Sequence, residues 1–107
     1  MIVHELKCWP EPFLEIALGR KTCELRYDDR QYKPGDVLIL RHWTPAHSDI
    51  NCEDGVYGDE AIVALVKGIQ NCSAPPLSAL VAEPLTVLMS IQVLHMTPRA
   101  VIARPPA

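Results

Sequence analysis

Apolar and polar positions change their spacing several times along the chain, and each change predicts an element of secondary structure. Residues 2–7 (IVHELK) alternate loosely, as in a strand. Pro10 and Pro12 interrupt this pattern, and apolar side chains then recur at helical spacing, so we expect a short helix over residues 11–18. Gly19 suits the left-handed backbone position that ends many helices. The chain is therefore expected to begin with a strand followed by a helix.

Four later segments have the alternating or continuously apolar character of strands. Together with the first segment, the predicted strands cover residues 2–7, 21–27, 37–43, 60–69 and 87–96. The sequence KPGD at residues 33–36 places proline and glycine in the order of a type II turn. This turn would lead directly into the third strand, whose apolar composition is typical of a strand buried on both faces.

Polar and proline-rich segments separate the later strands. Residues 44–59 form the longest predicted loop, which has room for a small hairpin, and residues 77–82 predict a second short helix before the last strand. Many short strands bounded by turns are typical of a small barrel or sandwich. We therefore predict a mainly-β α+β fold: a small barrel of five to six strands in a domain of residues 1–96, followed by a surface tail of residues 97–107.

The overall composition is that of one globular domain. The 107 residues are 49% hydrophobic and 21% charged, which is ordinary for a globular chain. No apolar run approaches the roughly 20 residues of a membrane span, and the start does not resemble a secretory signal. We therefore expect a cytoplasmic protein without membrane contact. None of the four cysteines is spaced Cys-x-x-Cys, so we expect reduced, half-buried thiols rather than disulfides.

The charges are distributed unevenly. A formal net charge of −3 argues against broad binding to the phosphates of duplex DNA. Residues 20–41 nevertheless hold six cations and four carboxylates, whereas the rest of the chain holds four cations and nine carboxylates. Any anion site should therefore be local and should lie within residues 20–41.

The second predicted strand has one wholly polar face. Its period of two places Thr22, Glu24 and Arg26 on one side, and Lys21, Cys23, Leu25 and Tyr27 on the other, where Cys23 would be a buried, inert thiol. Arg26 could hold Glu24 ionised, or Glu24 could aim the guanidinium at a ligand, with the Lys21 ammonium swinging over the same face. The alternative is a solvated hairpin face whose surface ion pair contributes about 0–1 kcal/mol.

Aromatic and metal-ligating side chains offer two further candidate chemistries. The aromatic residues on or near the basic segment are Trp9, Tyr27, Tyr32, Trp43 and Tyr57. Aromatic rings beside cations hold single-stranded nucleic acids, although each ring could equally serve core packing. His42, His47 and Cys52 are metal-ligand types, but their spacing matches no familiar zinc pattern. We therefore expect no metal and no cofactor, and we assign His42 as a hydrogen-bonded histidine within a strand.

Several short motifs within residues 4–41 resemble one known family. They are His4-Glu5-Leu6-Lys7, Trp9-Pro10, Gly19-x-Lys21-x-x-Glu24-x-Arg26 and Gly35-Asp36-Val37-Leu38. Together they resemble the ASCH domains of the PUA-like superfamily, in particular a small phage and bacterial branch of unassigned function. The resemblance implies a PUA-like β-barrel with a cleft between barrel and helix, and RNA or a nucleotide-like small molecule as the ligand.

The same resemblance suggests which residues line the cleft. The ligand-binding residues assigned on this basis are Lys7, Trp9, Arg20, Lys21, Thr22, Glu24, Arg26 and Tyr27. Lys21 and Arg26 would meet a phosphate or a base edge, and Glu24 would orient Arg26 or accept a hydrogen bond from a base amine. An aromatic ring would stack on the base.

Two other functions remain open from the sequence. Some ASCH-like relatives are hydrolases, namely single-strand ribonucleases or amidohydrolases of acetylated cytidine. Lys21 and Glu24 would then be the catalytic acid–base candidates, with His4 as a further one and Thr22 as a nucleophile. The third interpretation is a phage-type protein that binds a host protein through residues 44–59 or the tail. The sequence does not determine the oligomeric state.

Overall fold

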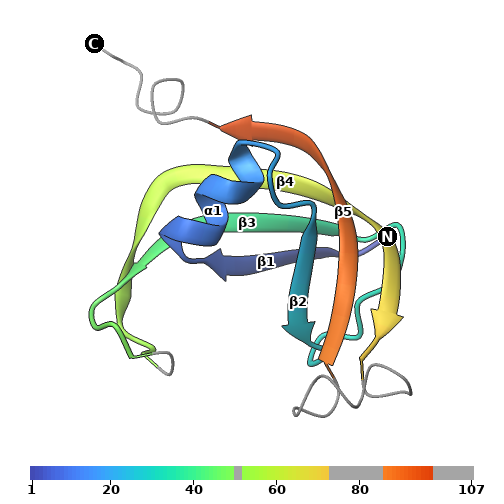
Figure 1. The fold of residues 1–107 in the computed structure, drawn as a ribbon, viewed down its shortest axis with the longest axis horizontal. Coiled ribbons are helices and arrows are strands. Elements are labelled where there is room, and N and C mark those ends of the chain that lie inside the picture. Colours follow the sequence, from blue (N-terminus) through green and yellow to red (C-terminus); the bar gives the residue numbers. More distant parts are fainter. Residues whose placement is uncertain (50–51, 73–85, 98–107) are drawn as a thin grey trace.

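The computed structural model describes residues 1–49, 52–72 and 86–97, which form one curved sheet with a helix on one side of it (Figure 1). In chain order the elements are β1 (Val3–Cys8), α1 (Pro10–Ala17), β2 (Cys23–Tyr27), β3 (Val37–Pro45), β4 (Gly55–Asn71) and β5 (Thr86–Thr97). A mainly-β α+β fold with a short helix after the first strand is therefore confirmed. The predicted helix over residues 77–82 lies outside the described residues, as do residues 98–107 of the predicted tail.

The five strands follow the order β1-β3-β4-β5-β2, with β1 and β3 parallel and the other neighbours antiparallel. The long strands β4 and β5 bend strongly (Figure 1), and their register shifts twice, between Val63 and Ala64 and between Val66 and Gly68. Such irregularities increase the local bend and twist of a strand pair. The predicted closed barrel is nevertheless wrong, because β1 and β2 remain the two outer strands and no backbone ladder joins them.

Local sequence signals place both ends of α1. Pro10 occupies the first turn, where its missing N–H costs nothing, and Gly19 follows the last turn with φ of +76°. The N–H of Gly19 donates to the carbonyl of Ile16 at 3.0 Å, and the N–H of Arg20 donates to that of Glu15 at 2.9 Å. This is the hydrogen-bond pattern of a Schellman motif, which satisfies carbonyls that the helix leaves unpaired. The predicted helix is thus confirmed, one residue earlier at each end.

The turn before β3 also follows the sequence prediction. Gly35 has φ of +93°, which favours glycine, and the N–H of Asp36 donates to the carbonyl of Lys33 at 3.0 Å. The predicted polar loop over residues 44–59 is shorter than expected. Both β3 and β4 extend into it, and a further bond from the N–H of Ala46 to the carbonyl of Asp54, 2.7 Å long, continues their hairpin.

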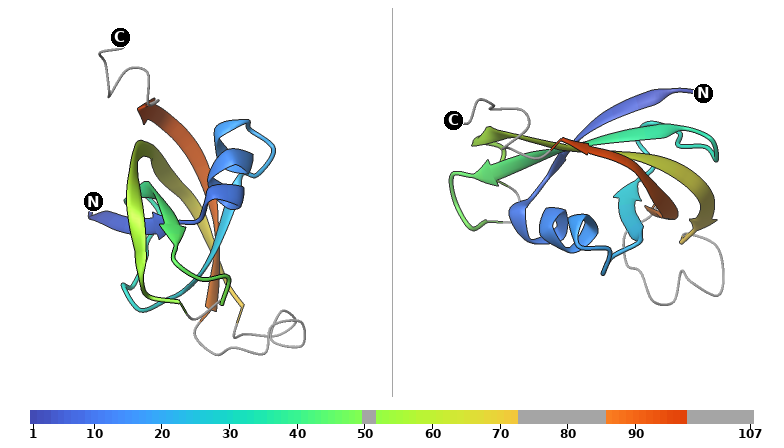
Figure 2. Two further views of the ribbon diagram at one scale, coloured as in Figure 1. Left: turned by 90° about the vertical axis from the view of Figure 1, so that its left-hand side faces the viewer. Right: turned by 90° about the horizontal axis from the view of Figure 1, so that it is seen from above.

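The core lies between α1 and the concave side of the sheet, and Figure 2 shows the helix packed on one side only. Phe13 and Ile16 are the buried side chains of the helix, at a spacing of three residues. The sheet contributes buried positions two residues apart, namely Leu6 and Cys8, Leu38 and Leu40, Ile62, Ala64 and Val66, and Val87, Met89 and Ile91. Burial at this period of two indicates one covered face on each strand.

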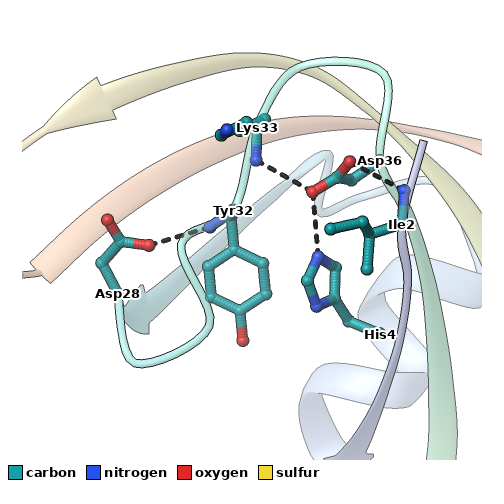
Figure 3. Close-up of polar contacts among 6 residues, drawn as sticks. All are labelled: Ile2, His4, Asp28, Tyr32, Lys33 and Asp36. Atoms are coloured by element: carbon teal, nitrogen blue, oxygen red, sulfur yellow. Dashed lines mark hydrogen bonds and ion pairs between the residues drawn. The ribbon is translucent and has the colours of Figure 1, made fainter.

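A buried polar pair joins β1 to the turn before β3 (Figure 3). Asp36 Oδ2 lies 2.9 Å from His4 Nε2, and the Asp36 carboxylate also accepts the backbone N–H groups of Ile2 and Lys33, each at 3.1 Å. The Tyr32 ring packs edge-on against the imidazole, with 4.7 Å between the ring centroids. The His4 hydrogen bond is the largest cause that holds the pKa of Asp36 below its ordinary value, and the two N–H donors act in the same direction.

Candidate ligand-binding site

Glu24 is the centre of a charged cluster on β2. Its side chain points inward and the residue is only 3% exposed. Lys21 Nζ lies 3.1 Å from Glu24 Oε1, and Arg26 Nε lies 2.9 Å from Glu24 Oε2. Both carboxylate oxygens are therefore paired with cations, which offsets the cost of removing the charge from water.

The orientation of β2 is the reverse of what its apolar residues suggested. Leu25 and Tyr27, predicted to face the core, are each 54% exposed, and Cys23 is half-buried instead of fully buried. The polar residues Glu24 and Arg26 face inward instead. The physical reason is that β2, which among the described strands pairs with β5 alone, has inward polar groups that satisfy one another. The Glu24 carboxylate pairs with Lys21 and Arg26, and the Arg26 guanidinium also donates to the Lys7 carbonyl.

Arginine side chains cross the space between the two outer strands. Arg26 Nη2 donates to the backbone carbonyl of Lys7 at 2.7 Å, and Arg30 Nη1 donates to that of Glu5 at 3.1 Å. Carbonyls two residues apart on a strand point in the same direction, so both lie along one edge of β1. This edge of β1 has no neighbouring strand among the described residues, and side chains form hydrogen bonds to it instead.

The charged cluster lines a hollow of about 500 Å³, which we call the first hollow. Its walls are Lys7, Cys8, Trp9, Pro12, Lys21, Glu24, Leu25, Arg26, Trp43 and Cys52. Of the described residues, three cations and one carboxylate line it, so the first hollow is locally positive on a chain of net charge −3. Such a site suits a compact anion.

Two tryptophans form the aromatic wall of the first hollow. Trp43 is only 2% exposed, since Lys7 Nζ lies 4.5 Å from its ring centroid and the Trp9 ring lies 6.2 Å away. Trp9 remains partly exposed. Trp9 is therefore the ring available for stacking, whereas Trp43 supports Lys7 and Trp9 from behind.

The structure brings together five of the eight residues predicted to bind a ligand: Lys7, Trp9, Lys21, Glu24 and Arg26. Arg20 lies elsewhere, exposed and paired with Glu15, whose two carboxylate oxygens each lie 3.2 Å from Arg20 Nε. Thr22 is exposed, does not line the first hollow, and its carbonyl accepts the N–H of Ile91 at 3.0 Å. Tyr27 lines a neighbouring hollow.

Cys8 lines the first hollow, but the sequence did not identify it as a candidate site residue. Its position two residues after buried Leu6 on the same strand could have indicated that it faces inward. Burial, with a smaller contribution from the Glu24 charge, raises the pKa of the Cys8 thiol to about 11, while Arg26 and Lys21 act in the opposite direction. The thiolate is therefore scarce at neutral pH. All four cysteines are free thiols, but they are not all half-buried: Cys8 and Cys72 are fully buried.

Two further hollows adjoin the first. The second hollow, of about 280 Å³, shares Lys7 and Arg26 with it and is otherwise lined by Glu5, Leu6, Tyr27, Asp29, Arg30, Tyr32 and Tyr57. A larger one, of about 700 Å³, shares Trp9 and Pro12 and is otherwise lined by Pro10, Glu11, Thr44, Pro45, Ala46, His47 and Ser48. Among the described residues no lysine or arginine lines the larger hollow, so it is less suited to an anion than the other two.

The predicted acid–base and metal-ligand histidines lie elsewhere. His4 is held by Asp36 and lines neither the first nor the second hollow. The His42 ring packs edge-on against Phe13, 5.1 Å between centroids, and its Nδ1 is buried without a hydrogen-bond partner among the described residues. In the same part of the chain, no three or more His, Cys, Asp or Glu side chains gather as a metal site would require, and no helix has the length and hydropathy to span a bilayer.

Comparisons with known proteins place the chain in a family without assigning it an activity. Residues 3–79 match the family described as "Domain of unknown function (DUF3850)", and the chain belongs to this family. A stretch of 41 residues is 42% identical to the "Uncharacterized 12.9 kDa protein in GpA 3'region" of Escherichia phage P2. That stretch covers 38% of this chain and 38% of the phage protein, so the similarity extends over well under half of either.

Proposed function

We propose that this member of the DUF3850 family binds RNA or a nucleotide-like ligand in the first hollow. Lys7, Lys21 and Arg26 would contact phosphate, and Trp9 would stack on a base. The observation that carries the proposal is the cluster itself: two cations paired with one buried carboxylate, in a hollow that Lys7 and a partly exposed tryptophan also line.

The hydrogen bonds of the cluster suit recognition of an anion. Glu24 and the Lys7 carbonyl each hold the Arg26 guanidinium, which fixes its plane before a ligand arrives. Pre-organised donors lose less conformational entropy on binding than free side chains. The Lys21 and Arg26 side chains remain 33% and 27% exposed, so both can reach a ligand from the solvent side.

The size of the first hollow and the family resemblance also support a nucleotide. A volume of about 500 Å³ lies within the range of roughly 300–1,000 Å³ that is common for small-molecule sites. Lys21, Glu24 and Arg26 belong to the G-x-K-x-x-E-x-R motif that resembles the ASCH domains of the PUA-like superfamily, in which the motif faces a cleft beside the helix. On this analogy the ligand is single-stranded, because stacking on Trp9 requires an unpaired base.

Titration distinguishes this function from an unspecific charged surface. Single-stranded RNA and the four nucleoside 5′-monophosphates are titrated against the wild type, Lys21→Ala and the control Lys67→Ala, whose lysine is exposed on β4 outside all the hollows described above. We expect Lys21→Ala to weaken binding by about tenfold and to reduce the salt dependence for RNA by roughly 0.7 in log–log slope. If Lys21→Ala and Lys67→Ala bound with equal affinity, Lys21 would not be part of the binding site. If the wild type bound none of these ligands, the proposed function would be wrong.

A hydrolase is the second candidate, favoured by the 3.1 Å contact between Lys21 Nζ and Glu24 Oε1, a geometry suited to proton transfer. Two observations weigh against it. Thr22, the predicted nucleophile, does not line the first hollow, and the raised pKa of Cys8 keeps its thiol protonated. Product from single-stranded RNA or acetylated cytidine that disappears in Lys21→Ala would favour the hydrolase. A rate of turnover no higher than that of a heat-inactivated sample would contradict the hydrolase and favour a protein that only binds its ligand.

A further inference from the structure

The second hollow continues the first across a hydrogen bond between the outer strands. Lys7 and Arg26 line both hollows, and the 2.7 Å bond from Arg26 Nη2 to the Lys7 carbonyl lies where they meet. Two side chains that carry positive charge therefore stand at the boundary, with one hollow on each side.

The second hollow repeats the chemistry of the first. Two aromatic rings in its wall are accessible, with Tyr27 54% and Tyr57 43% exposed. Arg41 places its guanidinium carbon 3.9 Å from the centroid of the Tyr57 ring, which restrains that ring. Arg30 adds a cation and is itself fixed by its bond to the Glu5 carbonyl.

The carboxylates of the second hollow do not cancel its cations. Glu5 is already paired with Arg41, with 3.1 Å between Oε1 and Nη1. Asp29 then shares the second hollow with Lys7, Arg30 and Arg26, and of these three cations Arg26 is also paired with Glu24. An excess of positive charge thus extends from the first hollow into the second.

We propose that the second hollow is a subsite for a neighbouring nucleotide, so that the ligand is a single-stranded chain of at least two nucleotides. This inference rests on the proposed function of the first hollow. One base would stack on Trp9, the linking phosphate would bind Lys7 and Arg26 at the boundary, and the next base would lie against the tyrosines of the second hollow. Aromatic rings that alternate with cations match a repeating unit of base and phosphate, whereas a phosphorylated peptide would need the cations alone.

The experiment compares ligands of one and two units. The four nucleoside 5′-monophosphates and the sixteen 5′-phosphorylated ribodinucleotides are titrated by calorimetry against the wild type. We expect the tightest dinucleotide to bind about tenfold more tightly than the tightest mononucleotide, because a second stacked base adds its own contribution. Tyr57→Ala should remove this gain without changing mononucleotide affinity, and Tyr57→Phe, which keeps the ring, should retain it.

The control is Leu94→Ala, which also truncates an exposed apolar side chain on the sheet but lies outside both hollows. It should retain the full gain, and circular dichroism would verify that each variant is folded. Mononucleotide binding without any gain for dinucleotides would overturn the second subsite and leave the proposed function intact. A gain that survives in Tyr57→Ala would also overturn it. Failure of every ligand to bind would overturn both proposals together.

Discussion

Arg26 Nη2 on β2 donates a 2.7 Å hydrogen bond to the backbone carbonyl of Lys7 on β1, although these strands stand at opposite ends of the sheet order. Arg30 makes a similar bond to the carbonyl of Glu5. The sheet curls enough for a side chain to span the distance between its outer strands. It does not curl enough for the two strands to form backbone hydrogen bonds with each other. Guanidinium groups thus take the place of the missing ladder and stand at the candidate site.

Arg26→Ala should lower the free energy of unfolding by about 1–2 kcal/mol. The change removes the bond to the Lys7 carbonyl and one of the two cations that pair with buried Glu24. Arg20→Ala is the matched control, because its ion pair with Glu15 is exposed and screened by solvent and should contribute little to stability. Urea denaturation measures both. An equal loss in the two variants would contradict a role for Arg26 in joining β1 and β2.

Glu24→Gln should also destabilise the fold, by about 1–3 kcal/mol. The amide keeps the shape of the side chain but leaves Lys21 and Arg26 without the buried negative charge that both contact. Glu53→Gln changes an exposed carboxylate in the β3–β4 loop and should have almost no effect. Thermal melting at low and high salt checks this prediction. Salt should reduce the repulsion between Lys21 and Arg26, so the difference in melting temperature between Glu24→Gln and the wild type should be smaller at high salt. A Glu24→Gln variant as stable as Glu53→Gln would contradict it.

Asp36 should govern part of the acid unfolding of the protein. Its pKa in the folded state lies below the ordinary value of 3.8, mainly because of the hydrogen bond to His4, so the unfolded chain binds a proton more readily. The resulting stability is present above about pH 3.8 and is lost as the pH falls through the lower pKa of the folded state. Asp36→Asn should therefore be less stable at pH 7, and its stability should fall less steeply below pH 3.8.

Urea denaturation at a series of pH values measures this dependence. Asp59→Asn, which changes an exposed carboxylate on β4, serves as the control and should retain the slope of the wild type. An unchanged slope for Asp36→Asn would show that other carboxylates account for the acid unfolding.

Cys8 should resist alkylation while the protein is folded. Because burial raises the pKa of the thiol to about 11, little thiolate is present at pH 8, although Cys8 lines the first hollow. Cys23 and Cys52 are less buried and should react with iodoacetamide before Cys8 and Cys72 do. Peptide mapping by mass spectrometry gives the order of labelling. Rapid modification of Cys8 at pH 8 would contradict the assignment of a neutral thiol and would strengthen the hydrolase alternative.

Local signals predicted most of the elements. Proline in the first turn of the helix, Gly19 after its last turn and the Pro34-Gly35 turn act through the conformation of one or two residues, so these signals are visible without knowing the fold. Likewise, the strand pattern of residues 37–43 depends only on neighbouring side chains, and β3 includes all of them. The cluster of cations within residues 20–41 pointed to Lys21, Arg26 and Arg30, which line the two hollows, but not to Lys7, which lines both.

The sequence by itself determined the approximate positions of the described strands, of α1 and of the turn before β3, and which residues of β2 share a face, but it did not show that β3 and β4 extend into the predicted loop. Only the tertiary structure decided which face turns inward. A period of two divides Glu24 and Arg26 from Leu25 and Tyr27, but it does not say which pair meets the interior. Glu24 faces inward because Lys21 and Arg26 pair with its carboxylate there. The Lys7 carbonyl on the edge of β1 accepts a further hydrogen bond from Arg26. Whether the sheet closes into a barrel likewise depends on contacts between strands that are distant in the sequence. No local pattern of residues predicts such contacts, and here the sheet stays open between β1 and β2.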